Sequence, residues 1–590
     1  MQPYHDRVQL YTSELEQINK KYNTISLLRL CSVLGSLVGI FYAIKTGENI
    51  FIGIAIILAA LFIVLMRMHT KLSWQKKLKQ ALIKVNKDEI SYLSGKSIPF
   101  DNGAECNDFQ HPYAYDLDVF GENSLFQNLN RTQTYIGKQT LAKLLLTLLP
   151  NEEILRNQEA VKELAEKIDW RQDSMASAKV NKDSKELYET VMNWSTKPSE
   201  PVSKVVQVLS YIMPVGVLGS IVAYQFINAI WLVDVITIGF VFNLLLLGSQ
   251  TKKIKNEIHK ADSVHQIIHQ YSLIVQKIEQ ETFVAPKLKE LQQKLGYKNQ
   301  KASTQITKLA ELFSRMDSMA NVITTVLFNG LFLFHVHTLR ALIQWKKDHA
   351  ANIKQWLDVI GEMEALHSLG NLSHNNPDFC YPTLNTNYEI VFKDLTHPLL
   401  NAQKRIGNDV TFQPQSFMIL TGSNMSGKST FLRSLGVNMV LTGIGSPVCA
   451  TEATVHPLPV LVSMRLSDSL SDSESYFFAE IKRLKQIMDE LAHQRAFVLL
   501  DEILRGTNSD DKRSGTIAVV KKMIDKQAIG AIATHDIEVC LTTNEYPAVL
   551  INKCFEVEII NNDLFFDYKL RDGICKNKSA TFLMQKMGVI

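Results

Sequence analysis

The sequence predicts an α/β P-loop domain of the ABC type, joined to a mostly α-helical region that carries two transmembrane helical hairpins. Three observations predict this fold. An apolar strand pattern at 417–420 leads through a glycine-containing loop into a helix, a second apolar run at 496–500 ends in two carboxylates, and two pairs of long apolar runs lie earlier in the chain. At roughly 150 residues per domain, the 590 residues are enough for about three to four domains. We divide them into an N-terminal region, 1–104, a helical core or lever region, 105–380, and the α/β domain, 381–590.

Composition excludes several classes of protein. Lys and Arg number 63 and Asp and Glu number 59, a net charge of +4, which excludes a chain that is basic overall and binds polyanions over its whole surface. Apolar residues make up 46% and charged residues 21%, so most of the chain is expected to fold. The seven cysteines are widely spaced and form no C-x-x-C pair, which indicates a reducing compartment with neither a disulfide framework nor a zinc site.

The first pair of apolar runs predicts a membrane hairpin over about 25–68. Residues 25–44 are broken only by Arg29, residues 45–48 form a short polar turn, and residues 49–66 carry no charge. Each run is near the roughly 20 residues that a helix needs to cross a bilayer. Basic residues flank both outer ends, which places those ends in the cytoplasm by the positive-inside rule. A signal peptide is disfavoured because a second apolar run follows at once.

The pattern recurs and predicts a second hairpin over about 205–248. In this region the only charge is Asp234, a break at 226–229 divides the run into two, and basic residues again flank both ends. We therefore expect four spans in a multi-pass protein of the cytoplasmic (inner) membrane, with the α/β domain in the cytoplasm. The alternative is a pair of helical hairpins buried in a soluble core. The shorter apolar run from Val322 to Val336 predicts a buried core helix rather than another span.

A phosphate-binding loop is predicted directly after the apolar strand at 417–420. The residues read G-x-x-x-x-G-K-S and lead into a helix, and strand, loop and helix in this order are the context that a P-loop requires. Backbone N–H groups of such a loop bind phosphate oxygens, Lys428 would reach the β- and γ-phosphates, and the Ser429 hydroxyl would bind Mg²⁺. The sequence therefore predicts a site for ATP and Mg²⁺ formed by Gly422, Ser423, Asn424, Met425, Ser426, Gly427, Lys428, Ser429 and Thr430.

Two later strands are predicted to bring further side chains to this loop. The apolar run at 496–500 ends in Asp501 and Glu502, which is the Walker B pattern. Asp501 would hold the Mg²⁺ shell and Glu502 would polarise the attacking water. Another short apolar run ends in His535, which a P-loop sheet would place near the γ-phosphate. The alternatives are an ordinary acidic strand end and an ordinary core or surface histidine.

The segment between the P-loop and the Walker B strand predicts a capped helix. Residues 469–475 are rich in Ser, Asp and Glu, and apolar residues in Tyr476–Leu491 recur at helical spacing, with Ser475 as the N-cap. In ABC-type ATPases the segment at this point supplies a serine and a helix N-terminus to the nucleotide of a second subunit. An ordinary capped helix is the alternative.

In combination these motifs resemble those of the MutS family. Thr421–Thr430 resembles T-G-P-N-M-G-G-K-S-T, and Asp501–Thr507 resembles D-E-I-G-R-G-T. Ser475–Glu480 resembles S-T-F-M-V-E, the family's equivalent of the ABC signature, and Ala533–His535 is similar to the family's switch histidine segment.

The resemblance extends beyond the nucleotide motifs. Asp118–Thr134 is similar to the start of the MutS core domain, Thr396–Leu399 to the R-H-P-x segment ahead of the P-loop, and Tyr568–Leu570 to the late Y-K-L. The resemblance is dense over about 381–590 and patchy over about 113–380.

The resemblance implies an ATP-hydrolysing, DNA-binding protein that forms a homodimer around ATP, with Ser475 completing the partner's site, and that binds mismatched or branched DNA in repair at the membrane. The chain also departs from the family. Nothing before residue 100 resembles the mismatch-recognition domain, we identify no clamp domain, and Ser423 and Ser426 replace Pro and Gly of the family's loop. The alternative is an ABC-like membrane ATPase with no DNA role, in transport or mechanical work. The missing L-S-G-G-Q string and the segment 118–134 favour the MutS-type function.

Overall fold

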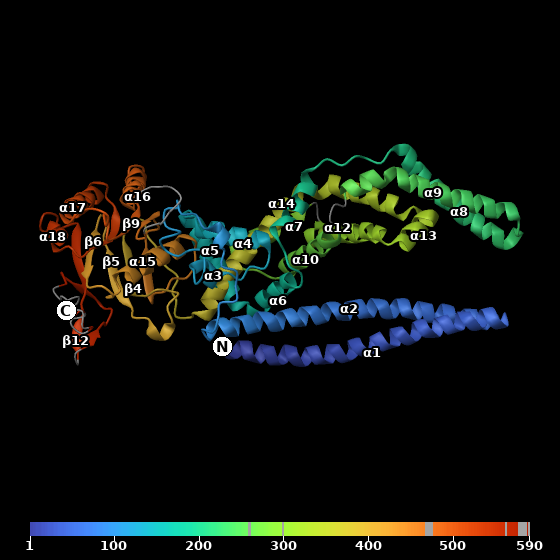
Figure 1. Cartoon of the computed structure of the whole chain (residues 1–590), viewed down its shortest axis with the longest axis horizontal. Coiled ribbons are helices and arrows are strands. Elements are labelled where there is room, and N and C mark those ends of the chain that lie inside the picture. Colours follow the sequence, from blue (N-terminus) through green and yellow to red (C-terminus); the bar gives the residue numbers. More distant parts are fainter. Residues whose placement is uncertain are drawn as a thin grey trace.

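The protein is elongated, with its large sheet at one end and its long apolar helices at the other (Figure 1). The computed structural model describes residues 1–257, 261–297, 300–465, 476–560, 563–575, 584 and 587. The chain starts near the middle of the molecule, runs to the far end along α1 (Gln2–Thr46) and returns along α2 (Asn49–Leu93). The predicted boundary at 380–381 lies in the segment between the last helix of the core, which ends at Asn375, and the first strand of the α/β part, which begins at Thr383.

A six-stranded sheet, in the order β14-β11-β6-β10-β9-β8, forms the centre of the α/β part. All neighbouring strands run parallel except β14, which is antiparallel to β11. Every residue of β6, β9 and β10 is buried, which explains why these strands read as continuous apolar runs. Because they are parallel, the loops that follow them leave at one edge of the sheet. The strands are β6 (Phe417–Gly422), β8 (Val460–Ser463), β9 (Phe497–Asp501), β10 (Ile529–Ala533), β11 (Leu550–Phe555) and β14 (Leu570–Asp572).

A second, mixed sheet, in the order β3-β7-β4-β5, packs beside the first. The ring of Phe412 on β5 meets the ring of Phe497 on β9 edge to face, with centroids 5.4 Å apart, so the two sheets share an apolar core. The strands are β3 (Thr383–Leu384), β4 (Ile390–Leu395), β5 (Asn408–Phe412) and β7 (Glu452–Val455). The helices of this part are α15 (Lys428–Gly443), α16 (Tyr476–Glu490), α17 (Ser509–Asp525) and α18 (Ile537–Leu541), and a small hairpin is formed by β12 (Glu558–Ile560) and β13 (Asp563–Phe565).

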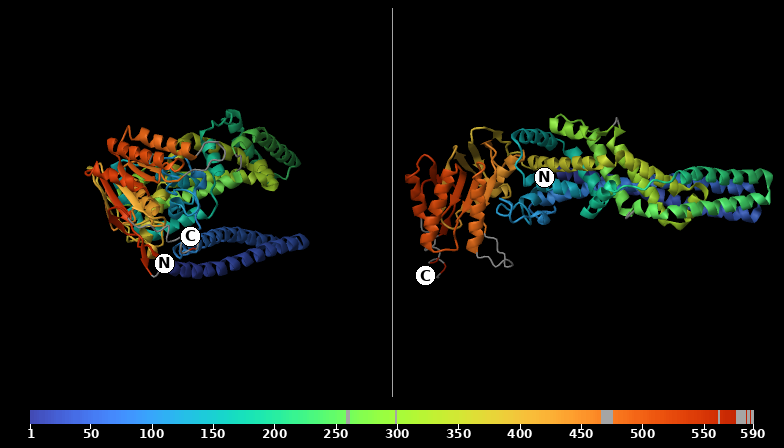
Figure 2. Two further views of the ribbon diagram at one scale, coloured as in Figure 1. Left: turned by 60° about the vertical axis from the view of Figure 1, so that its left-hand side comes forward. Right: turned by 90° about the horizontal axis from the view of Figure 1, so that it is seen from above.

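The helical core is organised around α14 (Phe334–Asn375), a helix of 42 residues. It packs on α4, α5 and α12 and runs from the end of the molecule that holds the long apolar helices to the base of the α/β part (Figures 1 and 2). The other helices of the core are α3 (Leu125–Leu129), α4 (Tyr135–Leu145), α5 (Asn151–Glu166), α6 (Ile168–Lys179), α7 (Lys185–Thr196), α10 (Ala261–Gln280), α11 (Pro286–Gln293) and α12 (Ala302–Asp317). Two short strands, β1 (Gly296–Tyr297) and β2 (Gln300–Lys301), precede α12.

Four of the described helices are long and apolar enough to cross a membrane, judged by length and composition: α1, α2, α8 (Lys204–Ile227) and α9 (Ile230–Glu257). The helices break at 47–48 and 228–229, inside the polar turn and the break that the sequence indicates. Both turns lie at the same end of the molecule (Figures 1 and 2). Ile57 on α2 and Ile238 on α9 are 69% and 70% exposed, so these hairpins are not buried in the chain's own core.

The prediction of a buried core helix over Val322–Val336 is wrong for its first part. Residues Val322–Phe332 form α13, and the side chains of Val322, Ile323 and Leu327 are 74%, 72% and 51% exposed. The chain then turns through Leu333, which has a φ of 50°, and α14 leaves at 85° to α13. Within α13 Asn329 and Gly330 are buried, and the buried apolar side chains begin at the bend with Leu333 and Val336. The prediction rested on the shortness of the apolar run, which is too short for a span and ends in His335 and His337, and neither feature distinguishes burial in protein from exposure on an apolar surface.

A buried ion pair fixes the base of the first hairpin to the core. Arg131 Nε donates to Glu89 Oε1 at 2.5 Å, and both side chains are 2% exposed. Asn371 and Asn375, near the end of α14, donate to the same carboxylate at 3.2 Å, and the Tyr4 hydroxyl donates to Asn375 Oδ1 at 2.7 Å. A buried charge with this many partners is satisfied. The hairpin and the end of α14 are therefore held together as one unit.

Candidate functional site

Strand β6 delivers the predicted P-loop to the edge of the sheet, and α15 begins at Lys428. Met425 and Gly427 have positive φ angles of 67° and 99°, so the loop includes a methionine in a conformation that only glycine adopts easily. A Cβ on Gly422 would lie 2.6 Å from Ser426 Oγ, which requires glycine there. No side chain caps the N-terminus of α15, which leaves its first N–H groups available to an anion.

The ammonium group of Lys428 lies inside this loop. Its Nζ donates to the backbone oxygens of Gly422 at 2.9 Å and Ser423 at 3.0 Å. The side chain is buried, and burial lowers the pKa of Lys428. Carbonyl oxygens compensate a buried positive charge only in part, so a phosphate oxygen would be a favourable additional partner. The predicted nucleotide-binding loop, residues 422–430, thus folds around the buried ammonium group of Lys428.

Asp501, at the end of β9, lies next to the first turn of α15. Ser429 Oγ donates to Asp501 Oδ2 at 2.6 Å. The other carboxylate oxygen, Oδ1, is buried and has no hydrogen-bond partner among the described residues, and the same holds for the hydroxyls of Ser423 and Ser426. A hydroxyl beside a carboxylate with a free oxygen forms the hard-oxygen ligand set that Mg²⁺ prefers. The two predicted metal ligands are therefore adjacent and fit a divalent cation.

Glu502 follows Asp501 in a strained backbone conformation with a φ of 49°. Its N–H donates to the carbonyl of Ala533 at 3.0 Å, which ties the end of β9 to the end of β10. His535 then lies across from it, with Nε2 2.8 Å from Glu502 Oε1. The hydrogen bond from His535 lowers the pKa of Glu502 to about 2. The carboxylate is thus held ionised, as a base that polarises water must be.

The proton on His535 can be assigned from its two neighbours. Nε2 lies 2.8 Å from the Glu502 carboxylate and 3.3 Å from Lys428 Nζ. A carboxylate only accepts and an ammonium only donates, so one ring nitrogen cannot serve both. The shorter and oppositely charged contact is to Glu502, so Nε2 carries the proton and donates it to the carboxylate. The three predicted catalytic residues, Lys428, Glu502 and His535, therefore meet at one point.

Sequence reasoning assigned no role to Glu480 on α16, which the structure places next to the loop that follows Glu502. Its carboxylate is buried and accepts the backbone N–H of Leu504 at 2.6 Å and of Arg505 at 3.2 Å. Leu504 has a φ of 61°, so these bonds hold a second strained residue just after Glu502. Arg505 in turn donates through Nε to the backbone oxygen of Glu502 at 2.9 Å. The sequence did contain a signal for this role, because Glu480 is the last residue of the motif that resembles S-T-F-M-V-E.

A cavity of 520 Å³ opens beside the P-loop. Its far wall comes from the segment that resembles R-H-P-x and from the late Y-K-L, represented by His397 and Tyr568. Tyr568 has a φ of 54°, and its ring lies 3.0 Å from the position of a Cβ on Gly427. Burial and nearby arginines lower the pKa of His397 to about 4, which keeps the ring neutral. Neutral aromatic rings next to a phosphate-binding loop suit the base and sugar of a nucleotide.

Ser475, predicted to act in a partner's site, lies outside the described residues, as does the rest of 466–475. The segments on either side of 466–475 both form hydrogen bonds with Asp116 of the helical region. The carboxylate of Asp116 accepts the N–H groups of Met464 and Arg465, each at 2.8 Å. Arg483 on α16 donates to Asp116 Oδ2 at 3.3 Å. The start of the core domain thus contacts the chain on both sides of the predicted signature segment.

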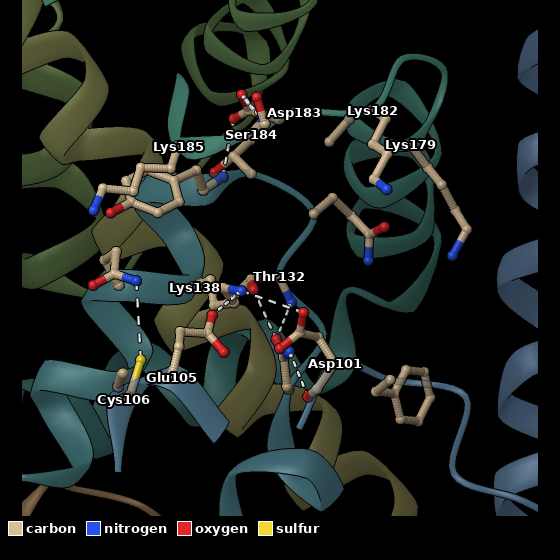
Figure 3. A pocket seen from close by; sticks show the side chains of 18 of the residues that line it. Asp101, Glu105, Cys106, Thr132, Lys138, Lys179, Lys182, Asp183, Ser184 and Lys185 are labelled. Atoms are coloured by element: carbon tan, nitrogen blue, oxygen red, sulfur yellow. Dashed lines mark hydrogen bonds and ion pairs between the residues drawn. The ribbon is translucent and has the colours of Figure 1, made fainter. Parts of the chain in front are cut away.

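A second cavity, of about 1010 Å³, lies elsewhere, between the end of α2, α4 and the α6–α7 connection (Figure 3). Lys138 there is paired with Asp101 and Glu105. Asp183 accepts the N–H of Tyr135 and the hydroxyl of Tyr271 at 2.9 and 2.8 Å. Lys138 and Asp183 thus already have partners within the protein, and we assign this cavity no chemistry.

Comparisons with known proteins agree with the geometry. Residues 418–588 match the family model "MutS domain V". The human "MutS protein homolog 4" is 30% identical over 201 residues, 32% of this chain and 21% of its own length. The "DNA mismatch repair protein MutS" of Methanosarcina barkeri is 25% identical over 459 residues, 71% of this chain and 51% of its own length.

A third relative, the "DNA mismatch repair protein MutS" of Desulfatibacillum aliphaticivorans, is 29% identical over 238 residues, 38% of this chain and 26% of its own length. The chain thus covers between about one fifth and one half of the curated relatives described here. The match to the family model contains the P-loop, the Walker B strand and His535. Over residues 418–588 the chain is therefore similar to domain V of the MutS family.

Proposed function

We propose that this protein binds ATP with Mg²⁺ and hydrolyses it, as a membrane-anchored ATPase of the MutS type that acts on DNA. The observation that carries the proposal is the pair of contacts at the edge of the sheet. Ser429 and Asp501 stand 2.6 Å apart as metal ligands, and Glu502 and His535 stand 2.8 Å apart as base and orienting group. Names of relatives that are DNA mismatch repair proteins support the same class of activity.

Each side chain has a separate task in hydrolysis. Lys428 binds β- and γ-phosphate oxygens, which replace the backbone oxygens that it now contacts. Glu502 accepts a hydrogen bond from the attacking water and orients it, and His535 holds the Glu502 carboxylate in position and ionised. Mg²⁺ bound by Ser429 and Asp501 would supply positive charge to the phosphate oxygens. Glu480 keeps the backbone after Glu502 fixed, so that the base does not move during the reaction.

We further propose that two copies close around ATP. Met425 in the P-loop lines the cavity and is 77% exposed, so an apolar side chain lies at the open face of the site. A second subunit that supplies Ser475 would cover this face and exclude water from the phosphates. In this proposal both subunits are copies of this chain, and each nucleotide site is formed by residues of both.

The apolar hairpins anchor the protein in a membrane in this proposal. Exposed apolar side chains cover α1, α2, α8 and α9, and basic residues flank their ends nearest the core. These features support a multi-pass protein of the cytoplasmic membrane, with the ATPase domain in the cytoplasm. The DNA substrate in this setting is mismatched or branched DNA, held by the helical arms of the dimer and processed in repair.

The test is the ATPase rate of the detergent-purified full chain, measured with mismatched, branched and plain duplex DNA at a fixed salt concentration. We expect Mg²⁺-dependent hydrolysis that a particular DNA structure stimulates. Hydrolysis that no DNA changes, together with no DNA binding at 50 mM salt, contradicts the DNA role and favours a membrane ATPase that acts on protein or lipid. Binding without hydrolysis in any condition contradicts the ATPase itself.

A further inference from the structure

We propose that α13 is a membrane-embedded helix that lies in the plane of the bilayer, among the acyl chains of the cytoplasmic leaflet. This inference rests on the proposed membrane anchoring and adds to it a surface that neither hairpin provides. No Asp, Glu, Lys or Arg occurs between Asp317 and Arg340, and α13 lies within this stretch.

The length and direction of α13 exclude a further span. Its 11 residues measure about 16 Å at 1.5 Å per residue, roughly half of the 30 Å hydrocarbon core. The bend of 85° at Leu333 turns the chain away before it crosses. Because α14 follows the long axis of the molecule together with both hairpins, a helix at 85° to it lies nearly parallel to the membrane surface (Figures 1 and 2).

The bend itself is a built feature. The side-chain oxygen of Asn329 accepts the N–H of His335 at 2.9 Å, and its amide nitrogen lies 2.7 Å from His335 Nδ1. His335 Nε2 contacts the Ser318 hydroxyl at 3.1 Å. Asn329 and His335 are fully buried, so these bonds are shielded from water. The direction of α13 is thus fixed by the protein, and it is independent of any membrane.

The contacts of α13 with the second hairpin determine its depth. Asn243 on α9 donates to the backbone oxygen of Gly330 at 2.8 Å, and a Cβ on Gly330 would lie 2.1 Å from the ring of Phe240. Phe240 and Asn243 are 10 and 13 residues from the start of α9, which corresponds to about 15–20 Å from the far turn. This is the middle of the bilayer or the half nearest the core.

A polar pair marks the near surface of the bilayer. Arg340 on α14 donates to the hydroxyl of Tyr211 on α8 at 2.7 Å. Tyr211 is 16 residues before the end of α8, about 24 Å from the far turn. Arginine and tyrosine are typical of the headgroup level. The helix α13 therefore lies about 5–10 Å inside that level, the depth at which interfacial helices bury their apolar faces.

The exposed side chains agree with lipid as the occupant. Ile323 and Val322 are more than 70% exposed, and Leu327 and Phe328 about half exposed. This surface continues directly into the exposed apolar surface of α8 and α9, on which α13 packs. A protein partner would need its own uncharged surface at the same depth, whereas acyl chains are already present around the hairpin.

The helix α13 is joined through Leu333 to α14, whose other end lies at the base of the α/β part. Because α14 is one continuous helix, it connects α13 directly with the base of the α/β part.

The experiment uses the full chain in liposomes of phosphatidylethanolamine and phosphatidylglycerol. Three variants are made, and in each of them one exposed phenylalanine is replaced by the photoreactive p-benzoylphenylalanine. The positions are Phe328 on α13, Phe41 on α1 as a reporter of the spans, and Phe109, on the surface of the helical region outside the apolar helices, as an aqueous control. These positions are 48%, 61% and 62% exposed, so each accepts a larger aromatic ring without repacking. Illumination is followed by mass spectrometry of the intact protein.

We expect phospholipid adducts at Phe328 and Phe41 and none at Phe109. An adduct at Phe41 without one at Phe328 overturns the proposal for α13 and leaves the membrane anchor intact. A crosslink from Phe328 to protein, in place of lipid, overturns it in favour of a second copy or another partner as the occupant. The lack of any lipid adduct at Phe41 refutes the membrane anchoring on which the proposal rests.

Discussion

The imidazole of His535 donates to the carboxylate of Glu502 across a gap of 2.8 Å between the ends of two neighbouring parallel strands. Glu502 itself has a positive φ, so its direction depends on this contact and on the backbone bond to Ala533. The Glu502 carboxylate is therefore oriented before a substrate binds. Replacement of Glu502 and replacement of His535 should have different effects on turnover.

Replacement of Glu502 by Gln keeps the shape of the site and removes the negative charge that polarises water. We expect turnover to fall at least 100-fold while ATP affinity changes less than threefold, because general-base catalysis contributes about 10²–10⁴-fold. Steady-state hydrolysis and equilibrium binding of a fluorescent ATP analogue measure the two quantities. Unchanged turnover would remove Glu502 from its role.

The pH dependence of turnover should reveal the contact with His535. Since the pKa of Glu502 is lowered from 4.5 to about 2, the carboxylate stays ionised through the mildly acidic range, and its protonation should not limit turnover between pH 8 and 5. In His535→Asn the pKa of Glu502 should rise, so the acidic loss of turnover moves to higher pH, on top of a lower plateau. An acidic limb at the same pH in both proteins would contradict the assignment.

The same pair affects stability with a defined sign. The folded-state pKa of Glu502 lies below its ordinary value of 4.5, so the contact stabilises the fold above about pH 4.5, and this contribution is lost as the pH falls toward 2. Thermal unfolding of the wild type and of Glu502→Gln should therefore differ more at pH 7 than at pH 3. Equal differences at both values of pH would argue against a stabilising contact.

Removal of the Ser429 hydroxyl should weaken Mg²⁺ more than ATP. In Ser429→Ala the cation loses one of its two protein ligands, and we expect the Mg²⁺ concentration for half-maximal turnover to rise at least tenfold, because loss of even an outer-shell partner of a metal ligand costs about 10–100-fold in affinity. Titration of Mg²⁺ at fixed ATP measures the effect. Ser514→Ala, on the surface of α17, is the matched control and should leave the titration curve in place.

Loss of the Glu480 carboxylate should impair catalysis from outside the reacting atoms. Glu480→Ala leaves two buried N–H groups without their charged acceptor, at a cost of about 1–3 kcal/mol for each group, so the loop after Glu502 should relax. We expect at least a tenfold loss of kcat with a smaller change in KM and a partial rescue by Glu480→Gln. Glu490→Gln, exposed on the same helix, controls for loss of charge.

The close approach of Gly330 to Phe240 predicts a packing defect on substitution. In Gly330→Ala the added methyl group would stand 2.1 Å from the ring, and we expect a loss of about 1–3 kcal/mol in the unfolding free energy in detergent. Gly248→Ala on α9 has no heavy atom within 4 Å of its added Cβ and is the control. Equal stability of the two variants would show that α13 does not rest on α9 as described.

How much the sequence could predict depends on how local the evidence is. The P-loop and the Asp501–Glu502 pair were predictable because a strand, a turn and a helix N-terminus are set by neighbouring residues, and parallel strands then bring their ends together. The role of Glu480 was not predictable in this way. It depends on two backbone N–H groups that face α16 only because Leu504 has a positive φ.

In the helical part, the sequence predicted the long apolar helices but not the position of a short one. The two hairpins were apparent from length and charge, since a run of about 20 uncharged residues has few alternatives. For α13 the same apolar signal was too short to decide between a protein core and a lipid surface. The turn at Leu333 and the packing of Gly330 against α9 settle its direction, and the second of these joins residues almost 90 positions apart in the chain.

The length of α14 has an electrostatic consequence. At 1.5 Å per residue its 42 residues measure about 63 Å, so in the proposed arrangement the ATP site stands several tens of ångströms above the lipid headgroups. The negative potential of an anionic leaflet falls off within a Debye length, about 8 Å at physiological salt. A polyanion bound near the ATPase domain would therefore experience no repulsion from the membrane to which the protein is attached. The length of α14 thus exceeds the range of the membrane's potential, so that one chain can contact lipid at one end and a negatively charged partner at the other.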